Sequence, residues 1–275
     1  MLLKILAAAV LLYGLVVLLI VALQDRLLFP TYAVPAGASV PPGWQRLAVA
    51  TPDGITLEGV HVPPVRSSDE RLLVLVFPGN GWNALDAAAL LHRTFPASHT
   101  VAFHYRGYAP SSGRASSAAL LRDAPLVLQA ARKQVAPTRT VVVGFSIGSG
   151  VAADAARQQG VGGAILVTPF DSLAAVARSH YPWLPVRAMF RHKMDAAVAL
   201  RGSYAPVAII AAEQDSIIPA SSTQRLREAA PRRVFDRTIA GAGHNDLYAR
   251  PEFVAAIREA MVAVLTASDD GADRP

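Results

Sequence analysis

The sequence Gly144-Phe145-Ser146-Ile147-Gly148 follows an apolar run at residues 141–143 and precedes a helix-like stretch at residues 151–158. A serine between a strand and a helix is typical of a nucleophile elbow, a sharp turn that exposes the hydroxyl group. The flanking glycines let strand and helix approach closely, because neither carries a Cβ atom. The pattern G-x-S-x-G also arises by chance, so its surroundings have to support this interpretation.

Short apolar runs on both sides of this turn indicate the strands of a sheet. They cover residues 72–77, 101–105, 140–143, 164–167 and 207–211. Each run is apolar on both faces and is separated from the next by a helix-length spacer, as in parallel strands that helices cover on both sides. An antiparallel hairpin around Pro52-Asp53-Gly54 is predicted to precede them. We therefore expect an α/β fold with a mostly parallel sheet of about eight strands flanked by helices.

The composition of the chain excludes several classes of protein. With 275 residues, 52% of them hydrophobic and 17% charged, the chain is long and apolar enough for one large folded domain. It has no cysteine, which excludes disulfides, thiolate catalysis and cysteine-containing zinc sites. The net charge of +6 is spread in short clusters such as Arg191-His192-Lys193, which argues against a nucleic-acid partner.

The N-terminal segment predicts a membrane anchor at residues 1–23. Residues 5–23 are nineteen consecutive uncharged positions, which as a helix approach the hydrocarbon thickness of a bilayer. The alternative is a cleaved signal peptide, but the apolar run exceeds the usual length and no A-x-A site precedes Gln24. Lys4 and the terminal amine lie before the run, so the positive-inside rule favours an exported (periplasmic or extracellular) catalytic domain.

The remainder of the chain divides into a linker, one domain and a tail. Residues 24–45 are rich in proline and predict a stiff, extended linker. Residues 46–267 contain the predicted sheet, and the tail at residues 268–275 is expected to be disordered. Residues 171–203 interrupt the strand and helix alternation with an apolar cluster at 181–190. This insertion is interpreted either as a small cap that lines an acyl pocket or as a helix packed on the sheet.

Two later loops carry the partners that a serine nucleophile needs. A hydroxyl group requires a base to take its proton and a carboxylate to orient that base. Asp215 follows the run at 207–211, and His244 follows the stretch at 233–239 in a glycine-rich loop. The order Ser146, Asp215, His244 is the one expected for this kind of turn on a parallel sheet, so we predict a catalytic triad.

Each of these assignments has a structural alternative. Ser146 would otherwise be a helix-capping serine, and His244 a core histidine. Asp171, just after the run at 164–167, is a rival carboxylate for His244, or a helix cap together with Ser172. We favour Asp215 as the orienting acid and expect Asp246 to cap the last turn.

Five motifs in this order resemble the α/β-hydrolase superfamily over about residues 46–266. They are Phe77-Pro78-Gly79-Asn80-Gly81, Tyr105-Arg106-Gly107-Tyr108, the pentapeptide around Ser146, Asp215 with Pro219, and Gly243-His244. The sequence at 24–30, after an apolar segment, looks like the N-terminally membrane-anchored serine hydrolases of this superfamily. Some of these hydrolyse lysophospholipids, monoacylglycerols or protein thioesters.

This resemblance implies an oxyanion hole formed by the backbone N–H groups of Asn80 and Ile147. It implies no cofactor and no metal. Pro78 departs from the pattern, since many members have His at this position.

These features together favour a membrane-anchored serine hydrolase, similar to a carboxylesterase, lipase or thioesterase, that cleaves an ester, thioester or amide of a hydrophobic acyl substrate. One alternative is a catalytically silent binding module with the same fold. A second is a dinucleotide-binding protein that uses the G-x-G-x-x-A loop at residues 79–84. That loop lacks the acid expected after the next strand, where His104-Tyr105-Arg106 stand instead.

Overall fold

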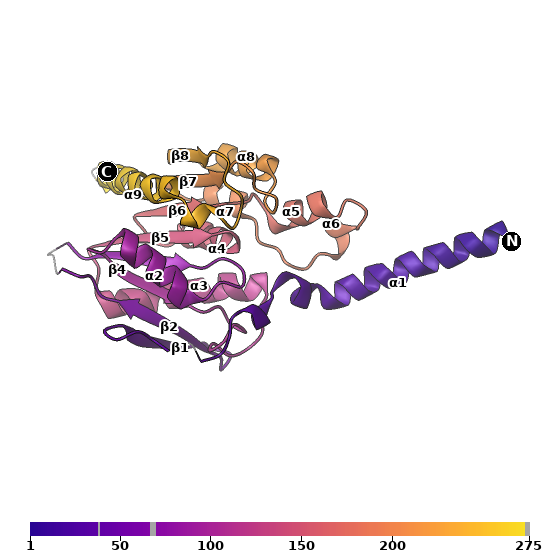
Figure 1. Ribbon diagram of the computed structural model, residues 1–275, viewed down its shortest axis with the longest axis horizontal. Coiled ribbons are helices and arrows are strands. Elements are labelled where there is room, and N and C mark those ends of the chain that lie inside the picture. The colour runs from indigo at the N-terminus through magenta and orange to yellow at the C-terminus, as the bar shows by residue number, and fades with distance from the viewer. Residues whose placement is uncertain (38, 67–69, 273–275) are drawn as a thin grey trace.

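The computed structural model describes residues 1–37, 39–66 and 70–272 of the 275-residue chain. Within these residues a sheet of eight strands has the order β1-β2-β4-β3-β5-β6-β7-β8 (Figure 1). The strands are β1 Gln45–Ala50, β2 Thr56–Val62, β3 Leu72–Phe77, β4 His99–Phe103, β5 Arg139–Phe145, β6 Gly163–Val167, β7 Val207–Ala212 and β8 Arg233–Ile239. The pairs β1–β2 and β2–β4 are antiparallel and the other pairs are parallel, which confirms the predicted fold class.

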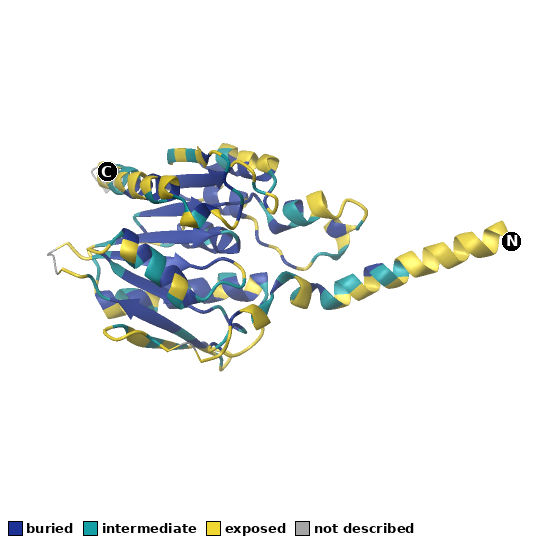
Figure 2. Ribbon diagram, viewed as in Figure 1, coloured by how far each residue is buried: buried dark blue, intermediate teal, exposed yellow. Residues whose placement is uncertain are grey.

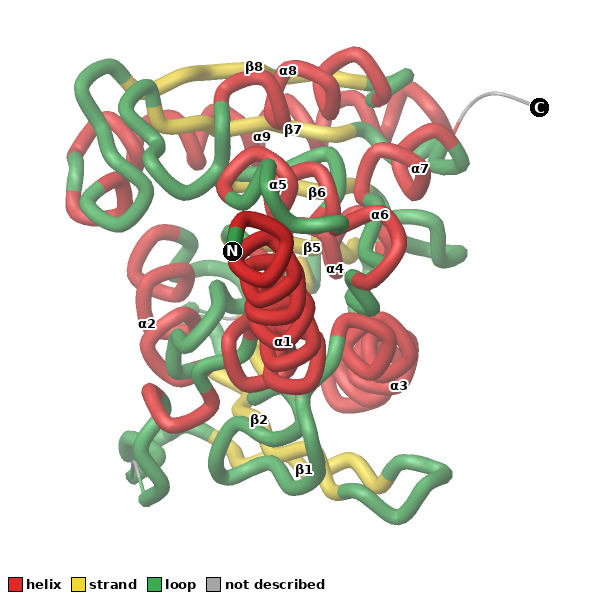
Figure 3. Tube along the Cα trace, turned by 90° about the vertical axis from the view of Figure 1, so that its right-hand side faces the viewer, coloured by secondary structure: helices red, strands yellow, loops and turns green. Residues whose placement is uncertain are grey.

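Helices cover both faces of this sheet. The helices of the described residues are α1 Leu2–Leu28, α2 Ala84–Thr94, α3 Ser117–Val135, α4 Ile147–Ala155, α5 Leu173–His180, α6 Val186–Met189, α7 Ala196–Arg201, α8 Ala220–Ala229 and α9 Pro251–Ala272, with short 3-10 turns at Thr31–Ala33 and Leu247–Ala249. Helix α2 lies on one side of the sheet and α3 on the other (Figure 3).

Alternation along the strands produces two apolar layers. In β5, Val142 packs in the layer that contains α3, α4 and α7, whereas Val141 and Val143 face the layer that contains α2 and α9. Neighbouring residues of a strand point to opposite faces, so a fully apolar strand buries both (Figure 2). The carboxyl edge of the parallel strands is left for the loops that follow them.

Helix α9 confirms one predicted face and corrects one predicted end. Phe253, Ile257 and Val264 are fully buried, as the helical spacing predicts. The helix continues to Ala272, so the tail expected to be disordered from residue 268 is helical up to that point. Residues 273–275 of the predicted tail lie outside the described residues.

The N-terminal helix is longer than predicted and projects from the domain (Figure 1). Among the described residues it is the helix that, by length and composition, could cross a membrane, with a mean hydropathy of 3.0 over its most apolar window. It ends at Leu28, and the next residue, Phe29, is only 3% exposed. The expected extended linker is therefore wrong in its first part, which is helical and then packs into the core, as Val34 also does.

The insertion between β6 and β7 contains helices α5, α6 and α7. Helix α7 packs against α4 and α8 and buries Leu200 completely, so this part of the insertion belongs to a helix layer of the domain. Helices α5 and α6 instead project from the domain on the side from which α1 leaves (Figures 1 and 3).

Candidate active site

Ser146 occupies a strained turn between β5 and α4. Its φ of 50° and ψ of −117° are unusual for a residue with a side chain, and its N–H donates to the Val167 carbonyl at 2.9 Å. A Cβ atom on Gly148 would overlap the carbonyl oxygen of Phe77, and one on Gly144 would overlap that of Gly148. Both flanking positions therefore need glycine so that α4 can start against β3 and β5.

His244 bridges the serine and the carboxylate. Its Nε2 lies 2.9 Å from Ser146 Oγ, and its Nδ1 lies 2.7 Å from Asp215 Oδ2. In the tautomer that satisfies both contacts, Nδ1–H donates to the carboxylate and Nε2 accepts from the hydroxyl. The His244 and Asp215 side chains are 5% and 7% exposed, so water competes little for this hydrogen bond. The structure thus brings together residues 98 and 29 positions apart in the chain.

Backbone groups hold the Asp215 carboxylate in place. Its Oδ1 accepts from the N–H groups of Ile217 at 2.9 Å and Ile218 at 2.7 Å. This leaves Oδ2 for His244. The N–H of Gln214 donates to the Ala242 carbonyl at 2.8 Å, which ties the loop after β7 to the loop after β8.

Asp171, the rival acid, has different partners. Its Oδ1 accepts from the Ser222 hydroxyl and its Oδ2 pairs with Arg225 Nε, both at 2.5 Å. Ser172 caps α5 by accepting from the Ala175 N–H, as one of the alternatives expected. The carboxylate of Asp171 is thus engaged by α8, and the carboxylate bonded to His244 is that of Asp215.

Asp246 stabilises the turn that presents His244. Its Oδ1 accepts from the Gly243 N–H at 2.6 Å, and its Oδ2 pairs with Arg250 at 2.6 Å. Arg250 also donates to the Gly241 carbonyl at 2.7 Å. The guanidinium of Arg250 lowers the pKa of Asp246 below its ordinary value, so this carboxylate remains charged at neutral pH.

A cavity of about 520 Å³ opens at Ser146 and His244. Its lining combines the Ser146 turn, the loop after β3, α5, the Asp215 loop, the His244 loop and the end of α1. The lining residues are Leu28, Gly79, Asn80, Trp82, Ser146, Ile147, Phe170, Leu173, Val176, Ile217, Ile218, His244, Asn245 and Tyr248. Its volume is in the range of small-molecule sites, and its walls are mainly apolar.

The lining corrects one expectation and adds residues that the sequence did not indicate. The apolar cluster at 181–190 does not line this cavity; Leu173 and Val176 of α5 do so in its place. Leu28 belongs to the predicted linker, and its role depends on the packing of α1. Tyr248 lies 5.2 Å from the Trp82 ring, centroid to centroid, and burial raises its pKa to about 12.

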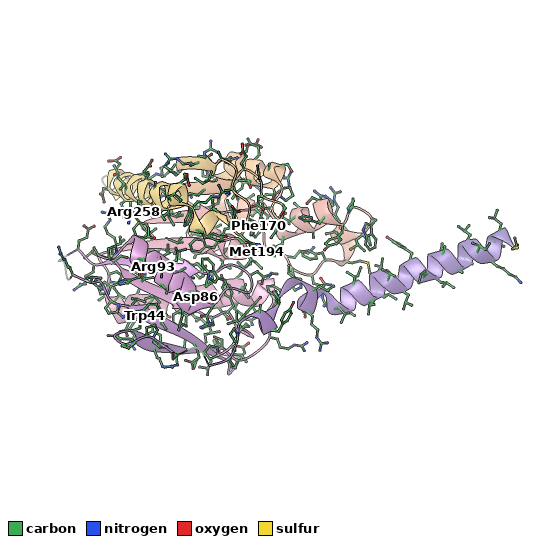
Figure 4. All side chains as sticks on the ribbon, viewed as in Figure 1. Trp44, Asp86, Arg93, Phe170, Met194 and Arg258 are labelled. Atoms are coloured by element: carbon green, nitrogen blue, oxygen red, sulfur yellow. The ribbon has the colours of Figure 1, made fainter. Side chains whose placement is uncertain are left out.

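Phe170 and Met194 lie where the insertion meets the body of the domain (Figure 4). Phe170 is fully buried and Met194 is 2% exposed. Both lie against Gly150 of α4, where a Cβ atom would collide with the Met194 side chain. The insertion therefore rests directly on the helix that begins at the Ser146 turn.

The loop after β3 is held by side chains of the Tyr105-Arg106-Gly107-Tyr108 motif. The Tyr108 hydroxyl donates to Asn80 Oδ1 at 2.5 Å, and Asn80 Nδ2 donates to the Leu28 carbonyl at 2.5 Å. The Tyr105 hydroxyl donates to the Pro78 carbonyl at 2.9 Å. Burial raises the pKa of both tyrosines above the ordinary value, so they remain donors. Asn80 and Ile147, the predicted oxyanion residues, both border the cavity.

The glycine loop at residues 79–84 faces the Ser146 cavity through Gly79, Asn80 and Trp82. At the start of α2, the Asn83 side chain accepts from the Leu85 N–H at 2.9 Å. A pyrophosphate would need this N–H and this space. The arrangement therefore favours a catalytic loop over a dinucleotide loop.

Comparisons with known proteins agree with this architecture. No family model matches the chain. An uncharacterized protein of Mycobacterium tuberculosis is 35% identical over 84% of each chain. The lysophosphatidylserine lipase ABHD12 of Danio rerio is 30% identical over 48% of this chain and 39% of its own.

A solved structure, the esterase Pf2001 of Pyrococcus furiosus, superposes with a TM-score of 0.64 at 16% identity, over 84% of this chain and 98% of its own. At this identity the likeness concerns the fold. With the strand order and the strained serine turn, these findings lead to one conclusion. The chain belongs to the α/β-hydrolase superfamily.

Proposed function

We propose that the protein is a membrane-anchored serine hydrolase that cleaves an ester, thioester or amide of a hydrophobic acyl substrate through an acyl-enzyme. The observation that supports this most strongly is the pair of hydrogen bonds that joins Ser146, His244 and Asp215 at the mouth of an apolar cavity. Hydrogen-bond contact between nucleophile, base and orienting carboxylate is the geometric requirement for this chemistry.

In the first half-reaction, Ser146 Oγ attacks the carbonyl carbon while His244 Nε2 takes the hydroxyl proton. Asp215 stabilises the resulting imidazolium through Nδ1–H. His244 then returns the proton to the leaving alcohol, thiol or amine, and the acyl group stays on Ser146. In the second half-reaction, water gives a proton to His244 and attacks the acyl carbon. The bond from that carbon to Ser146 Oγ then breaks, His244 returns the proton to Ser146, and the acid is released.

The negative charge that develops on the carbonyl oxygen needs donors in fixed positions. The N–H groups of Ile147 and Asn80 are proposed for this role, because both residues border the cavity next to Ser146. A donor of this kind contributes about 3 kcal/mol to lowering the barrier in other serine hydrolases. Tyr108 positions Asn80 through its side chain, which keeps the loop preorganised.

Two features support a hydrophobic acyl group and a membrane setting. Leu28, Leu173 and Val176 give the cavity apolar walls. Helix α1 carries an apolar stretch long enough to span a bilayer. We further propose an exported catalytic domain, since the positive charge of Lys4 and the terminal amine precede the apolar stretch.

The test is labelling of the full-length protein by a fluorophosphonate probe, followed by peptide mapping. We expect one modified residue, Ser146, and no labelling of Ser146→Ala. Ser149→Ala is the matched control, since Ser149 lies one turn along α4 and its hydroxyl donates to the Ser146 carbonyl. A folded wild-type protein that resists the probe, and that has no esterase activity, would favour the catalytically silent binding module instead.

A further inference from the structure

Residues 181–191, which we call the cap segment, lie along the second half of α1. The Tyr13 hydroxyl donates to the Trp183 carbonyl at 2.9 Å. Eleven positions later, the Gln24 side chain accepts from the Arg191 N–H at 2.8 Å and is only 5% exposed. Between these two contacts the cap segment packs along α1.

The packing between these contacts is apolar. A small cavity of about 40 Å³ separates the two elements. It is lined by Val17, Ile20, Val21, Gln24, Leu184, Pro185, Val186, Met189 and Phe190. The cap segment therefore packs against one face of α1 between Tyr13 and Gln24.

This contact limits how α1 can span a bilayer. The eleven residues from Leu2 to Leu12, which precede the first contact, extend only about 16 Å as a helix, against a hydrocarbon thickness of about 30 Å. The part of α1 after Tyr13 therefore has to enter the hydrocarbon as well. The cap segment packs against that part of α1, so it has to lie at the same depth in the bilayer.

The outer surface of the cap segment has the composition of a membrane interface. Tyr181 and Trp183 are 52% and 51% exposed, and the only charged residue between positions 181 and 190 is Arg187. Such a surface can enter a leaflet, because its apolar and aromatic side chains are stabilised there and a long arginine side chain can extend back toward the headgroups.

Basic residues surround this surface. Arg178, Arg187, Arg191 and Lys193 are all exposed. Arg191 pairs with Asp25 at 3.3 Å and at the same time donates to the Val21 carbonyl. Exposed basic side chains within and next to an apolar segment are suited to the headgroup region of a leaflet that contains anionic lipid.

We propose that the cap segment inserts with α1 into the leaflet next to the catalytic domain, and that the active site takes its acyl substrate from that leaflet. The second clause rests on the proposed hydrolase function; the first does not. Leu28 at the end of α1 and Val176 of α5, the helix that leads into the cap segment, both line the cavity at Ser146. The substrate class that fits is an acyl lipid whose chain enters along these walls with its carbonyl toward Ser146.

The absence of cysteine makes the insertion directly measurable. Full-length Trp183→Cys carries a polarity-sensitive fluorophore and is reconstituted in vesicles that contain phosphatidylglycerol and nitroxide-labelled lipid. The matched control is Tyr204→Cys, a 93% exposed position just before β7, at the end of the strand opposite to the Asp215 loop. We expect lipid quenching of the label at 183, at least about fivefold stronger than at 204. Equal quenching at the two positions would overturn the insertion.

A second experiment tests the source of the substrate. Trp183 does not line the cavity, so Trp183→Asp is expected to retain turnover of the water-soluble p-nitrophenyl butyrate. Turnover of an ester lipid embedded in vesicles should fall about tenfold or more, because a carboxylate opposes insertion. Equal losses on both substrates would refute delivery from the leaflet.

Fluorophosphonate labelling of the same preparations separates the two proposals. Quenching at position 183 without labelling of Ser146 would overturn the proposed function and the substrate source, and would leave the inserted segment established. Labelling of Ser146 without quenching at position 183 would overturn the further inference alone.

Discussion

Replacing Asp215 by Asn tests whether the carboxylate acts through the tautomer of His244. The two N–H groups on Oδ1, from Ile217 and Ile218, require an acceptor, so the amide oxygen of Asn is expected to take that position. The amide NH₂ then faces His244 Nδ1, which has to become the acceptor. The proton moves to Nε2, where it blocks transfer from Ser146.

The size of this effect follows from the same contacts. The productive tautomer can return only if the amide of the Asp215→Asn variant is turned over. This breaks the two hydrogen bonds from Ile217 and Ile218 and places the amide NH₂ against their N–H groups, which costs about 2–3 kcal/mol, or roughly a 30- to 150-fold loss of rate. Loss of the negative charge beside the imidazolium adds to this. We expect kcat/KM to fall by about 10³- to 10⁴-fold in total.

The assay is p-nitrophenyl ester hydrolysis by the detergent-solubilised protein, with circular dichroism to verify folding. Asp171→Asn is the matched control, because it changes a buried carboxylate bonded to Ser222 and Arg225 and not to His244. We expect this variant to lose stability but to keep kcat within about threefold per folded molecule. Equal losses for the two variants, or a larger loss for Asp171→Asn, would refute the role given to Asp215.

Three further changes test other parts of the structure. Tyr108→Phe removes the hydroxyl that holds Asn80, and kcat should fall about five- to tenfold with KM nearly unchanged, as measured by initial rates; a change confined to KM would contradict this. Burial lowers the pKa of His104 to about 4, so neutral His104 contributes fully to the free energy of unfolding above pH 6.5, and this contribution declines as the pH falls toward 4. Unfolding experiments should show a loss of roughly 3 kcal/mol over this range, and His104→Leu should remove that pH dependence. An unchanged pH profile in the variant would contradict this. Gly148→Ala should destabilise the protein by at least about 3 kcal/mol in chemical denaturation, because the new Cβ overlaps the carbonyl groups of Phe77 and Pro78. Gly202→Ala, whose Cβ would make ordinary contacts, should change stability by less than about 1 kcal/mol. Similar effects at both glycines would contradict this.

The sheet and the serine turn were predictable because their signals are local. The central strands β3, β5, β6 and β7 are buried on both faces. The two glycines that the turn requires lie within two residues of Ser146 in the sequence. The convergence of Ser146, Asp215 and His244 follows from topology, since loops after parallel strands meet at one edge. Their spacing was therefore informative even without a structure.

The remaining features depend on contacts between distant segments that leave no period in the sequence. The hydrogen bond from Asn80 to Leu28 spans 52 positions, and that from the Arg191 N–H of the cap segment to Gln24 spans 167. The prolines at 30, 35, 41 and 42 indicated an extended linker, because residue type reports local stiffness and not what a segment packs against. The choice between Asp171 and Asp215 likewise needed the position of Arg225.

The end of α1 packs into the domain that carries the candidate active site. Phe29 is 3% exposed and stacks edge-on against His192 at 5.1 Å, and burial of such a side chain contributes about 2–3 kcal/mol. Leu28 borders the cavity with its side chain and binds Asn80 through its carbonyl. A flexible linker would let the active site move freely relative to the bilayer. Here packing fixes the direction in which α1 leaves the domain, so the cavity, the cap segment and α1 keep one orientation, as the proposed access to a lipid in the adjoining leaflet requires.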